Sequence, residues 1–196
     1  MGKTKYQGNI LKLFEKSPVL DFASIERVVK EKKNVKQYAK QLVRNMIRAG
    51  KIRQITRGYY TFYDEASLAV FCFKPAYLGL QDSLSFHDLW EQETIPVIIT
   101  ARKARQGIRK VFNSNILIRR IDKKYFFGFN FEKQGKFVFP YSDIEKTFID
   151  MVYFKQKLSE EARNNFKKRI DKKKLKSYLK VYPARFRKKL EFQKVL

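Results

Sequence analysis

NVKQYAKQLVRNMIRAGKIRQITRG, the stretch from Asn34 to Gly58, decides how the first part of this chain folds. In its first half, apolar residues recur at intervals of three and four, which predicts a helix with one buried face. Asn34 is placed to cap the start of this helix, and Gly50 is placed to end it in a left-handed conformation. The apolar residues are Val35, Tyr38, Ala39, Leu42, Val43 and Met46.

The surroundings of this helix complete a small fold. Residues 6–16 and 22–29 show the same apolar spacing and predict two earlier helices, the second capped by Asp21. Residues 51–55 alternate as a strand, 56–58 turn the chain, and 59–63 form an aromatic returning strand. Three helices followed by a hairpin predict a winged helix-turn-helix, and we assign it to residues 1–66.

The opposite face of the helix after Asn34 consists of hydrogen-bond donors and has no carboxylate. Arg and Lys reach guanine or phosphate, and Gln pairs with adenine, so this face suits a DNA major groove. Alternatively, this face is an ordinary solvated helix surface, and Arg57-Gly58 is an ordinary hairpin turn. The predicted DNA-binding residues are Lys36, Gln37, Lys40, Gln41, Arg44, Arg48, Lys51, Arg53 and Arg57.

The charge of the chain points to a polyanionic partner. The 196 residues contain 44 Lys and Arg against 19 Asp and Glu, a formal net charge of +25. We expect no membrane partner, because no apolar run approaches the length of a transmembrane segment. The N-terminus lacks an apolar signal-peptide core, so we expect a cytoplasmic protein. The single cysteine, Cys72, excludes an internal disulfide.

Residues 67–154 predict a mixed α/β domain with an antiparallel sheet. A helix is expected over 79–90, a buried strand over 95–100, and three antiparallel strands over 116–121, 125–131 and 136–139. A further helix over 142–154 is expected to open with a capping box from Ser142 to Glu145. We interpret His87 as structural, because neither a His/Cys cluster nor a ligand-spaced motif accompanies it, and we expect no metal and no cofactor. The fold class is therefore α+β.

Two further segments are strongly basic. The loop 101–107 suits phosphate or an acidic protein, although a solvated loop is equally consistent with it. Residues 155–196 alternate basic and apolar residues, which predicts a docked appendage of two or three short helices interrupted at Pro183. Their exposed face is expected to be a second polyanion surface. The predicted secondary basic residues are Arg102, Lys103, Arg105, Lys167, Lys168, Lys172 and Lys173.

Three motifs in order resemble those of AbiEi-type antitoxins: residues 50–60 (GKIRQITRGYY), 77–89 (YLGLQDSLSFHDL) and 142–150 (SDIEKTFID). The resemblance covers roughly residues 5–154, and Asp88 stands where the family has Gly after His. It implies an N-terminal winged helix that represses its own operon and a later domain that counters a nucleotidyltransferase-like toxin. The DNA-facing positions it implies here are Gln37, Lys40, Gln41, Arg44, Arg48 and Arg57.

These observations favour a DNA-binding transcriptional repressor, and we expect it to form a homodimer over palindromic half-sites. We do not expect an enzyme, because Asp122, Asp143, Glu145 and Asp150 are scattered and no Gly-rich phosphate loop is present. The alternative is a stand-alone RNA-binding or architectural DNA-binding protein. Such a protein would bind with steep salt dependence and little sequence preference, whereas a repressor keeps discriminating as salt rises.

Overall fold

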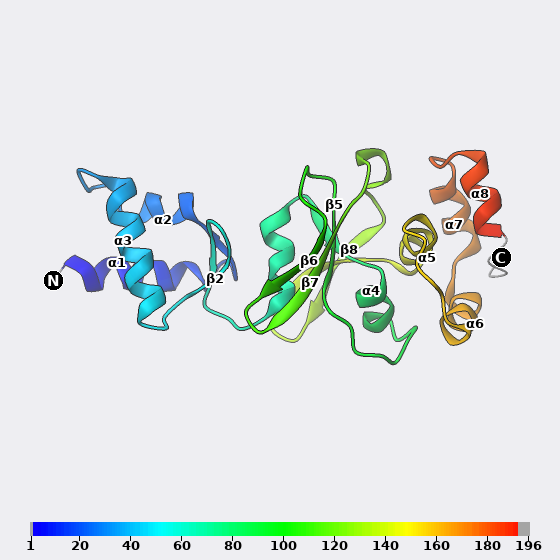
Figure 1. The fold of residues 1–196 in the computed structure, drawn as a ribbon, viewed down its shortest axis with the longest axis horizontal. Helices are drawn as coiled ribbons and strands as arrows, with labels where there is room; N and C mark the ends of the chain where they lie inside the picture. The colour runs from blue at the N-terminus through cyan, green and yellow to red at the C-terminus, as the bar shows by residue number, and fades with distance from the viewer. Residues whose placement is uncertain (1, 192–196) are drawn as a thin grey trace. The chain divides into compact units, whose positions relative to one another are not determined.

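The computed structural model describes residues 2–191 and shows an α+β protein (Figure 1). The chain divides into two compact units, Met1–Cys72 with Val111–Asn113, and Phe73–Lys110 with Ser114–Leu196. These units differ from the three segments, 1–66, 67–154 and 155–196, expected from the sequence. The apolar 3-10 helix η1 (Ala66–Phe73) groups mainly with the first unit. The basic C-terminal helices group with the second unit, because their apolar residues enter its core.

The first unit combines helices with a small antiparallel sheet of strand order β1-β3-β2. Strand β1 was not expected from the sequence, because two residues are too short for a periodic signal; Leu20 pairs with Tyr60. The elements are α1 (Gly2–Leu13), β1 (Leu20–Asp21), α2 (Phe22–Val28), α3 (Val35–Arg48), β2 (Arg53–Thr56) and β3 (Tyr59–Thr61).

Local signals in the sequence determine where these elements begin and end. The Asp21 carboxylate accepts a hydrogen bond of 2.8 Å from the backbone N–H of Ser24 and so caps α2. Gly50, at φ 65°, follows α3, and Gly58, at φ 82°, closes the β2–β3 turn, both in the left-handed region that glycine adopts most readily. Asn34 occupies the cap position of α3, but its side chain makes no capping hydrogen bond, contrary to expectation.

The second unit is built on a six-stranded sheet of order β6-β7-β5-β4-β9-β8. β4 pairs antiparallel with β5, and β8 with β9, whereas β5 and β7, and β4 and β9, are parallel. The expectation of an antiparallel sheet was therefore wrong. The strands are β4 (Ala76–Leu78), β5 (Val97–Thr100), β6 (Gly107–Val111), β7 (Ser114–Arg120), β8 (Phe129–Gln134) and β9 (Phe137–Ser142).

The difference between the expected and the observed strand pairing has a physical cause at residues 121–128. After β7 the chain forms the short 3-10 helix η2 (Lys123–Tyr125) and buries the Tyr125 ring in the helical core. This excursion carries the chain away from β7, so β8 forms a hairpin with β9 instead. Residues 125–128, expected to start a strand, consequently lie outside β8.

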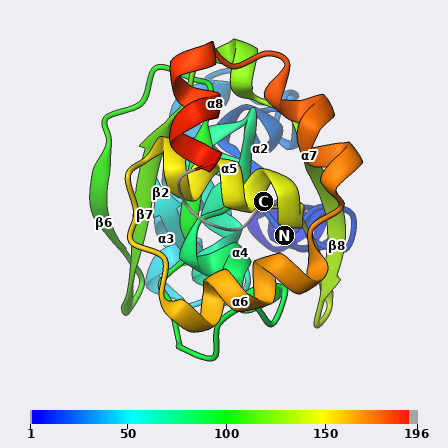
Figure 2. The same ribbon diagram turned by 90° about the vertical axis from the view of Figure 1, so that its right-hand side faces the viewer.

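Helices cover this sheet and share one apolar core with it. Figure 2 shows α6, α7 and α8 around α5, and each of the three contacts α5. Phe148 of α5, Phe166 of α6, Leu175 of α7 and Leu190 of α8 are fully buried in the same cluster. The helices are α4 (Gln81–Phe86), α5 (Ile144–Tyr153), α6 (Glu160–Arg169), α7 (Lys172–Leu179) and α8 (Ala184–Glu191).

Two expected helix boundaries in this unit were wrong. The helix expected over 79–90 extends only from Gln81 to Phe86. The cap of α5 is Asp143, whose carboxylate accepts from the Lys146 N–H at 2.8 Å; Ser142 is the last residue of β9. Glu145 does not return to the cap residue as a capping box requires, because it accepts from the Asp171 N–H at 2.9 Å.

No helix within residues 2–191 is both long enough and apolar enough to cross a membrane.

Candidate nucleic-acid interface

Helix α3 separates its apolar and its cationic residues onto opposite sides. Ala39, Leu42, Val43 and Met46 are buried in the core of the first unit. The solvent side contains no acidic residue, so α3 displays donors and positive charge without internal neutralisation. The structure thus places six of the predicted DNA-binding residues together on one exposed helix face. These residues, the α3 face, are Lys36, Gln37, Lys40, Gln41, Arg44 and Arg48.

The beginning of α3 borders a shallow open hollow of about 480 Å³. Lys33 and Asn34 line it together with Lys36, Gln37 and Lys40 of the α3 face. Farther along the helix, the Gln41 side-chain amide donates to the Asn45 Oδ1 at 3.0 Å, which aligns this amide along the helix surface. Phosphate and base edges are the kind of acceptor-rich partner that such a set of donors fits.

The three predicted residues outside α3 have different surroundings. Arg57 lies exposed at the β2–β3 turn, next to Gly58. Arg53 is held within the first unit by an ion pair of 2.7 Å with Asp64 and by the Phe112 ring, 5.6 Å from the guanidinium. Lys51 donates to the Gln7 Oε1 at 2.8 Å. Arg57 therefore joins the α3 face as an available cation, whereas Arg53 and Lys51 already have protein partners.

The secondary basic residues are all exposed, but they belong to separate elements. Arg102, Lys103 and Arg105 lie in the loop between β5 and β6. Lys167 and Lys168 end α6, and Lys172 and Lys173 begin α7, so these four surround one short connection.

A buried polar network in the second unit was missed by the sequence analysis. Asp150, named there only as one of four scattered acids, is fully buried together with Lys146, and the two form an ion pair one helical turn apart. The Tyr77 hydroxyl donates to the Asp150 Oδ2 at 2.7 Å. The ring of Phe127 lies 5.4 Å from the Lys146 ammonium. Burial lowers the pKa of Lys146 and raises the pKa of Asp150, and their mutual attraction opposes both shifts.

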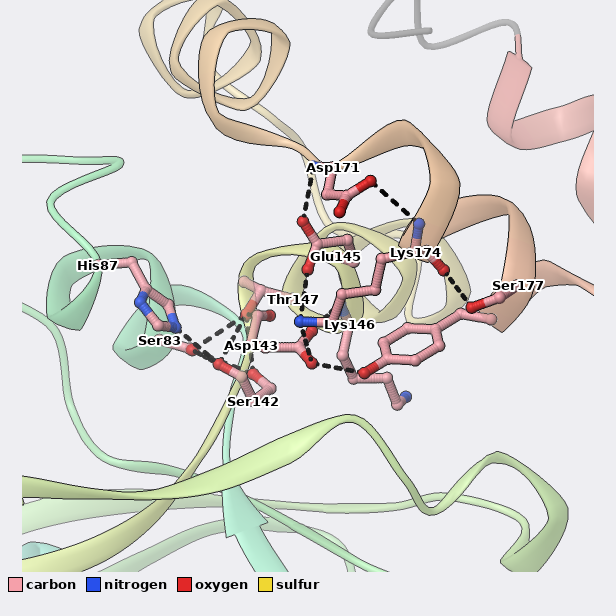
Figure 3. A network of polar contacts seen from close by, with 11 residues as sticks. Ser83, His87, Ser142, Asp143, Glu145, Lys146, Thr147, Asp171, Lys174 and Ser177 are labelled. Carbon is pink, nitrogen blue, oxygen red and sulfur yellow. Dashed lines mark hydrogen bonds and ion pairs between the residues drawn. The ribbon is translucent and has the colours of Figure 1, made fainter.

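Three buried hydroxyls join α4, β9 and α5 (Figure 3). The Ser142 Oγ lies 3.0 Å from the Ser83 Oγ and 2.8 Å from the Thr147 Oγ1. The His87 Nε2 lies 2.7 Å from the carbonyl oxygen of Ser142. Because a carbonyl only accepts, Nε2 carries the proton. His87 therefore binds backbone, consistent with the structural role expected for it.

The outer part of the network joins α5 to α7 (Figure 3). The Lys174 ammonium lies 3.1 Å from the Asp143 Oδ2 and 3.0 Å from the Glu145 Oε2. Although burial disfavours its charge, these carboxylates raise the pKa of Lys174 above its usual range. The Tyr178 hydroxyl donates to Asp143 at 2.7 Å, and burial together with this bond raises the pKa of Tyr178 to about 12.

The acidic residues considered as candidate acids thus have structural partners. Asp143 caps α5, Glu145 binds Lys174 and the Asp171 N–H, and Asp122 accepts from the Lys124 N–H at 3.1 Å. Within the described part of the chain, no group of three or more His, Cys, Asp or Glu side chains is placed to hold a metal ion. The spacing of Lys146 and Asp150 by one helical turn is compatible with an ion pair, but it does not indicate that the pair is buried.

Comparison with known proteins shows the fold and no family. No protein-family model matches this chain, and no curated protein matches it significantly. Among solved structures, it resembles the crystal structure of the RV2827C protein from Mycobacterium tuberculosis, with a TM-score of 0.59 and 10% identity. The match covers 96% of this chain and 76% of that chain. It therefore extends over both units, and at this identity it shows a shared fold alone.

Proposed function

We propose that residues 2–61 are a winged helix-turn-helix that binds duplex DNA, with α3 in the major groove and the β2–β3 hairpin as the wing. The order of helices and strands in this unit supports the fold. The observation that carries the function is the α3 face, which is exposed, cationic and free of carboxylates. Two alternatives, a solvated surface and backbone binding without base preference, are outcomes of the test below.

The chemistry of the α3 face divides its residues into two roles. Gln37 and Gln41 have amides that can pair with the donor and acceptor of adenine in the major groove. Arg44 can form a bidentate contact with guanine, and the remaining cations suit phosphates. Arg57 at the wing tip suits the backbone or an adjacent narrow minor groove, where negative potential is concentrated. Arg53 and Lys51, which bind within the chain, are supporting residues.

The proposal includes a regulatory role. A dimer reading two half-sites of a palindrome would occlude a promoter, which makes the chain a transcriptional repressor. The resemblance of its three motifs to AbiEi-type antitoxins extends this role to repression of its own operon and to countering a nucleotidyltransferase-like toxin. The motifs 77–89 and 142–150 contact each other in the buried network. Ser83 and Tyr77 of the first motif form hydrogen bonds with residues of α5, which belong to the second. These contacts support a structural role for both motifs.

The DNA-reading proposal is tested by selecting a preferred duplex from a random pool and comparing it with a random duplex. Arg44→Ala and Gln41→Ala should each weaken the selected duplex by about 1–3 kcal/mol more than the random one. Arg57→Ala should weaken both duplexes alike. Lys12→Ala, exposed on α1, removes the same charge as Arg44→Ala and is the matched control. Equal losses on both duplexes for every α3 variant would refute base reading by α3.

The antitoxin extension is tested separately. A nucleotidyltransferase-like reading frame next to this gene, toxic when expressed alone and harmless when expressed with this chain, is the expected result. A neighbourhood without such a frame, or toxicity unchanged by co-expression, leaves a stand-alone regulator and contradicts the extension.

A further inference from the structure

The positive charge of this chain is concentrated at both ends of the sequence. Residues 1–61 contain 15 Lys and Arg against 4 Asp and Glu, and residues 62–154 contain 13 against 11. Residues 155–196 contain 16 against 4. The first excess includes the proposed DNA-reading face, whereas the last belongs to the second unit, outside the unit that contains α3.

Helices α6, α7 and α8 hold these C-terminal charges in a fixed orientation. Phe166, Leu175, Leu179 and Leu190 are buried in the core of the second unit, so the opposite sides of the helices face solvent. The cations on those sides are exposed, and we call them the C-terminal basic face. They are Arg163, Lys167, Lys168, Lys172, Lys173, Lys176, Lys180, Arg185, Arg187, Lys188 and Lys189.

The acidic groups around α7 are already engaged. Asp171 caps α7 by accepting from the N–H groups of Lys173 and Lys174. Asp143 and Glu145 are buried and pair with Lys174, which points inward. No cation of the C-terminal basic face forms an ion pair with an acidic residue of the described chain. Crowded like charges repel one another, so an anionic partner would relieve a cost that the folded chain otherwise bears.

The side chains around this face indicate which anion fits. The aromatic residues of these helices and of the connection between α7 and α8 turn inward: the Tyr182 ring is buried and stacks on Phe186, and Tyr178 binds Asp143. Single-strand binders need aromatic platforms for bases, and among the described residues of α6–α8 no exposed aromatic side chain provides one. Membrane-surface helices insert their apolar sides, which here lie in the core.

We propose that the C-terminal basic face binds the phosphate backbone of a nucleic-acid duplex without reading its bases. The site is independent of α3, because it belongs to the second unit and needs only a high density of phosphates. It would add affinity and salt dependence to any duplex that the chain engages, without changing sequence preference.

The test uses the full chain and fluorescent duplexes of random sequence, one DNA and one RNA, with affinity measured against salt. The α7 triple variant Lys172→Gln, Lys173→Gln, Lys176→Gln should make the negative slope of log K against log salt shallower by about 2–3. Its affinity should fall on the order of tenfold at moderate salt, by equal factors on selected and random DNA. Lys110→Gln, Lys123→Gln, Lys133→Gln removes the same charge from exposed positions elsewhere in the second unit and should change neither quantity.

A second triple variant, Arg187→Gln, Lys188→Gln, Lys189→Gln on α8, repeats the test independently of α7. The proposal is overturned if both triples keep the parent slope. It is equally overturned if single strands bind more tightly than duplexes, or if the triples lose binding only to phosphatidylserine vesicles. The DNA and RNA arms decide which duplex is preferred.

Failure of this proposal is distinguishable from failure of DNA reading by α3. Lys40→Gln, Arg44→Gln, Arg48→Gln should abolish the preference for the selected duplex and leave binding that the α7 triple then reduces. Loss of preference in the α3 triple with no effect of the α7 and α8 triples would support α3 alone. The reverse pattern would support the C-terminal basic face alone.

Discussion

Lys146 carries its ammonium into the interior of the second unit, where Asp150 pairs with it and the ring of Tyr77 lies 5.6 Å away. Removing one member of such a pair leaves the other charge buried without a partner, which is far more costly than the pair itself is favourable. We therefore expect the ion pair to contribute to the specificity of packing between α5 and β4 more than to net stability.

Lys146→Met should lower the free energy of unfolding by about 3–5 kcal/mol, because Asp150 then remains buried without its cation. The double variant Lys146→Met, Asp150→Leu should cost less than the sum of the two single variants, since the pair is then replaced by apolar groups. Urea unfolding measures all three. Strict additivity would show that the two groups do not interact in the folded state.

Tyr178 gives the stability of the second unit a dependence on alkaline pH. Its pKa is raised to about 12 in the folded chain, from about 10 in the unfolded chain. The hydrogen bond to Asp143 thus contributes fully below pH about 10 and is lost as pH rises through the folded pKa. Between pH 10 and 12, the parent should therefore lose more stability than Tyr178→Phe does. Parallel unfolding curves for the two proteins would contradict this linkage.

At the scale of single residues, the sequence predicted caps and turns better than buried charges. Asp21, Gly50 and Gly58 act locally, so their roles follow from the residue type and its neighbours. Lys146 and Asp150 have polar side chains, and their burial results from helices α6–α8 covering α5, which no local pattern encodes. The cap of α5 lies at Asp143 and not at Ser142 for a related reason, because Ser142 pairs in the sheet.

At the scale of elements, α2 is capped by Asp21 and contacts α3. Asp21→Ala removes the side-chain acceptor for the Ser24 N–H and should destabilise the first unit by about 1 kcal/mol. Glu26→Ala, within the same helix, is the control and should have a smaller effect. Thermal unfolding monitored by circular dichroism measures both, and equal destabilisation would remove capping as the cause.

Helices were predicted more accurately than strand pairing. The apolar period of α3 specifies both its existence and its buried face, because both depend on neighbours within one turn. The β-branched residues of β5 predicted a strand but not its partners. Its parallel pairing with β7 and antiparallel pairing with β4 are set by connections of many residues, which a local pattern does not contain.

For the whole molecule, the division into two compact units predicts largely independent unfolding. Lys146→Met should accelerate amide hydrogen exchange in α4 to α8 and leave exchange in α1 to α3 near that of the parent. Hydrogen exchange followed by mass spectrometry resolves the two regions. Equal acceleration in both would show that the units unfold as one.

Charge acts at this largest scale as well. Both ends of the sequence are strongly basic and the middle is nearly neutral, so composition predicted a polyanionic partner. Composition does not say which face meets that partner. The structure adds that the α3 face and the C-terminal basic face are each exposed and belong to different units.

The most direct test of DNA reading by α3 is to map where this helix lies on the duplex. Cys72, the single native cysteine, is 2% exposed, so a cysteine at an exposed position can be labelled selectively. An iron chelate attached to Gln37→Cys should cleave the selected duplex at one short major-groove segment, whereas the chelate on Lys12→Cys of α1 should not. Diffuse cleavage from position 37, or localised cleavage only from position 12, would contradict the placement of α3 in the groove.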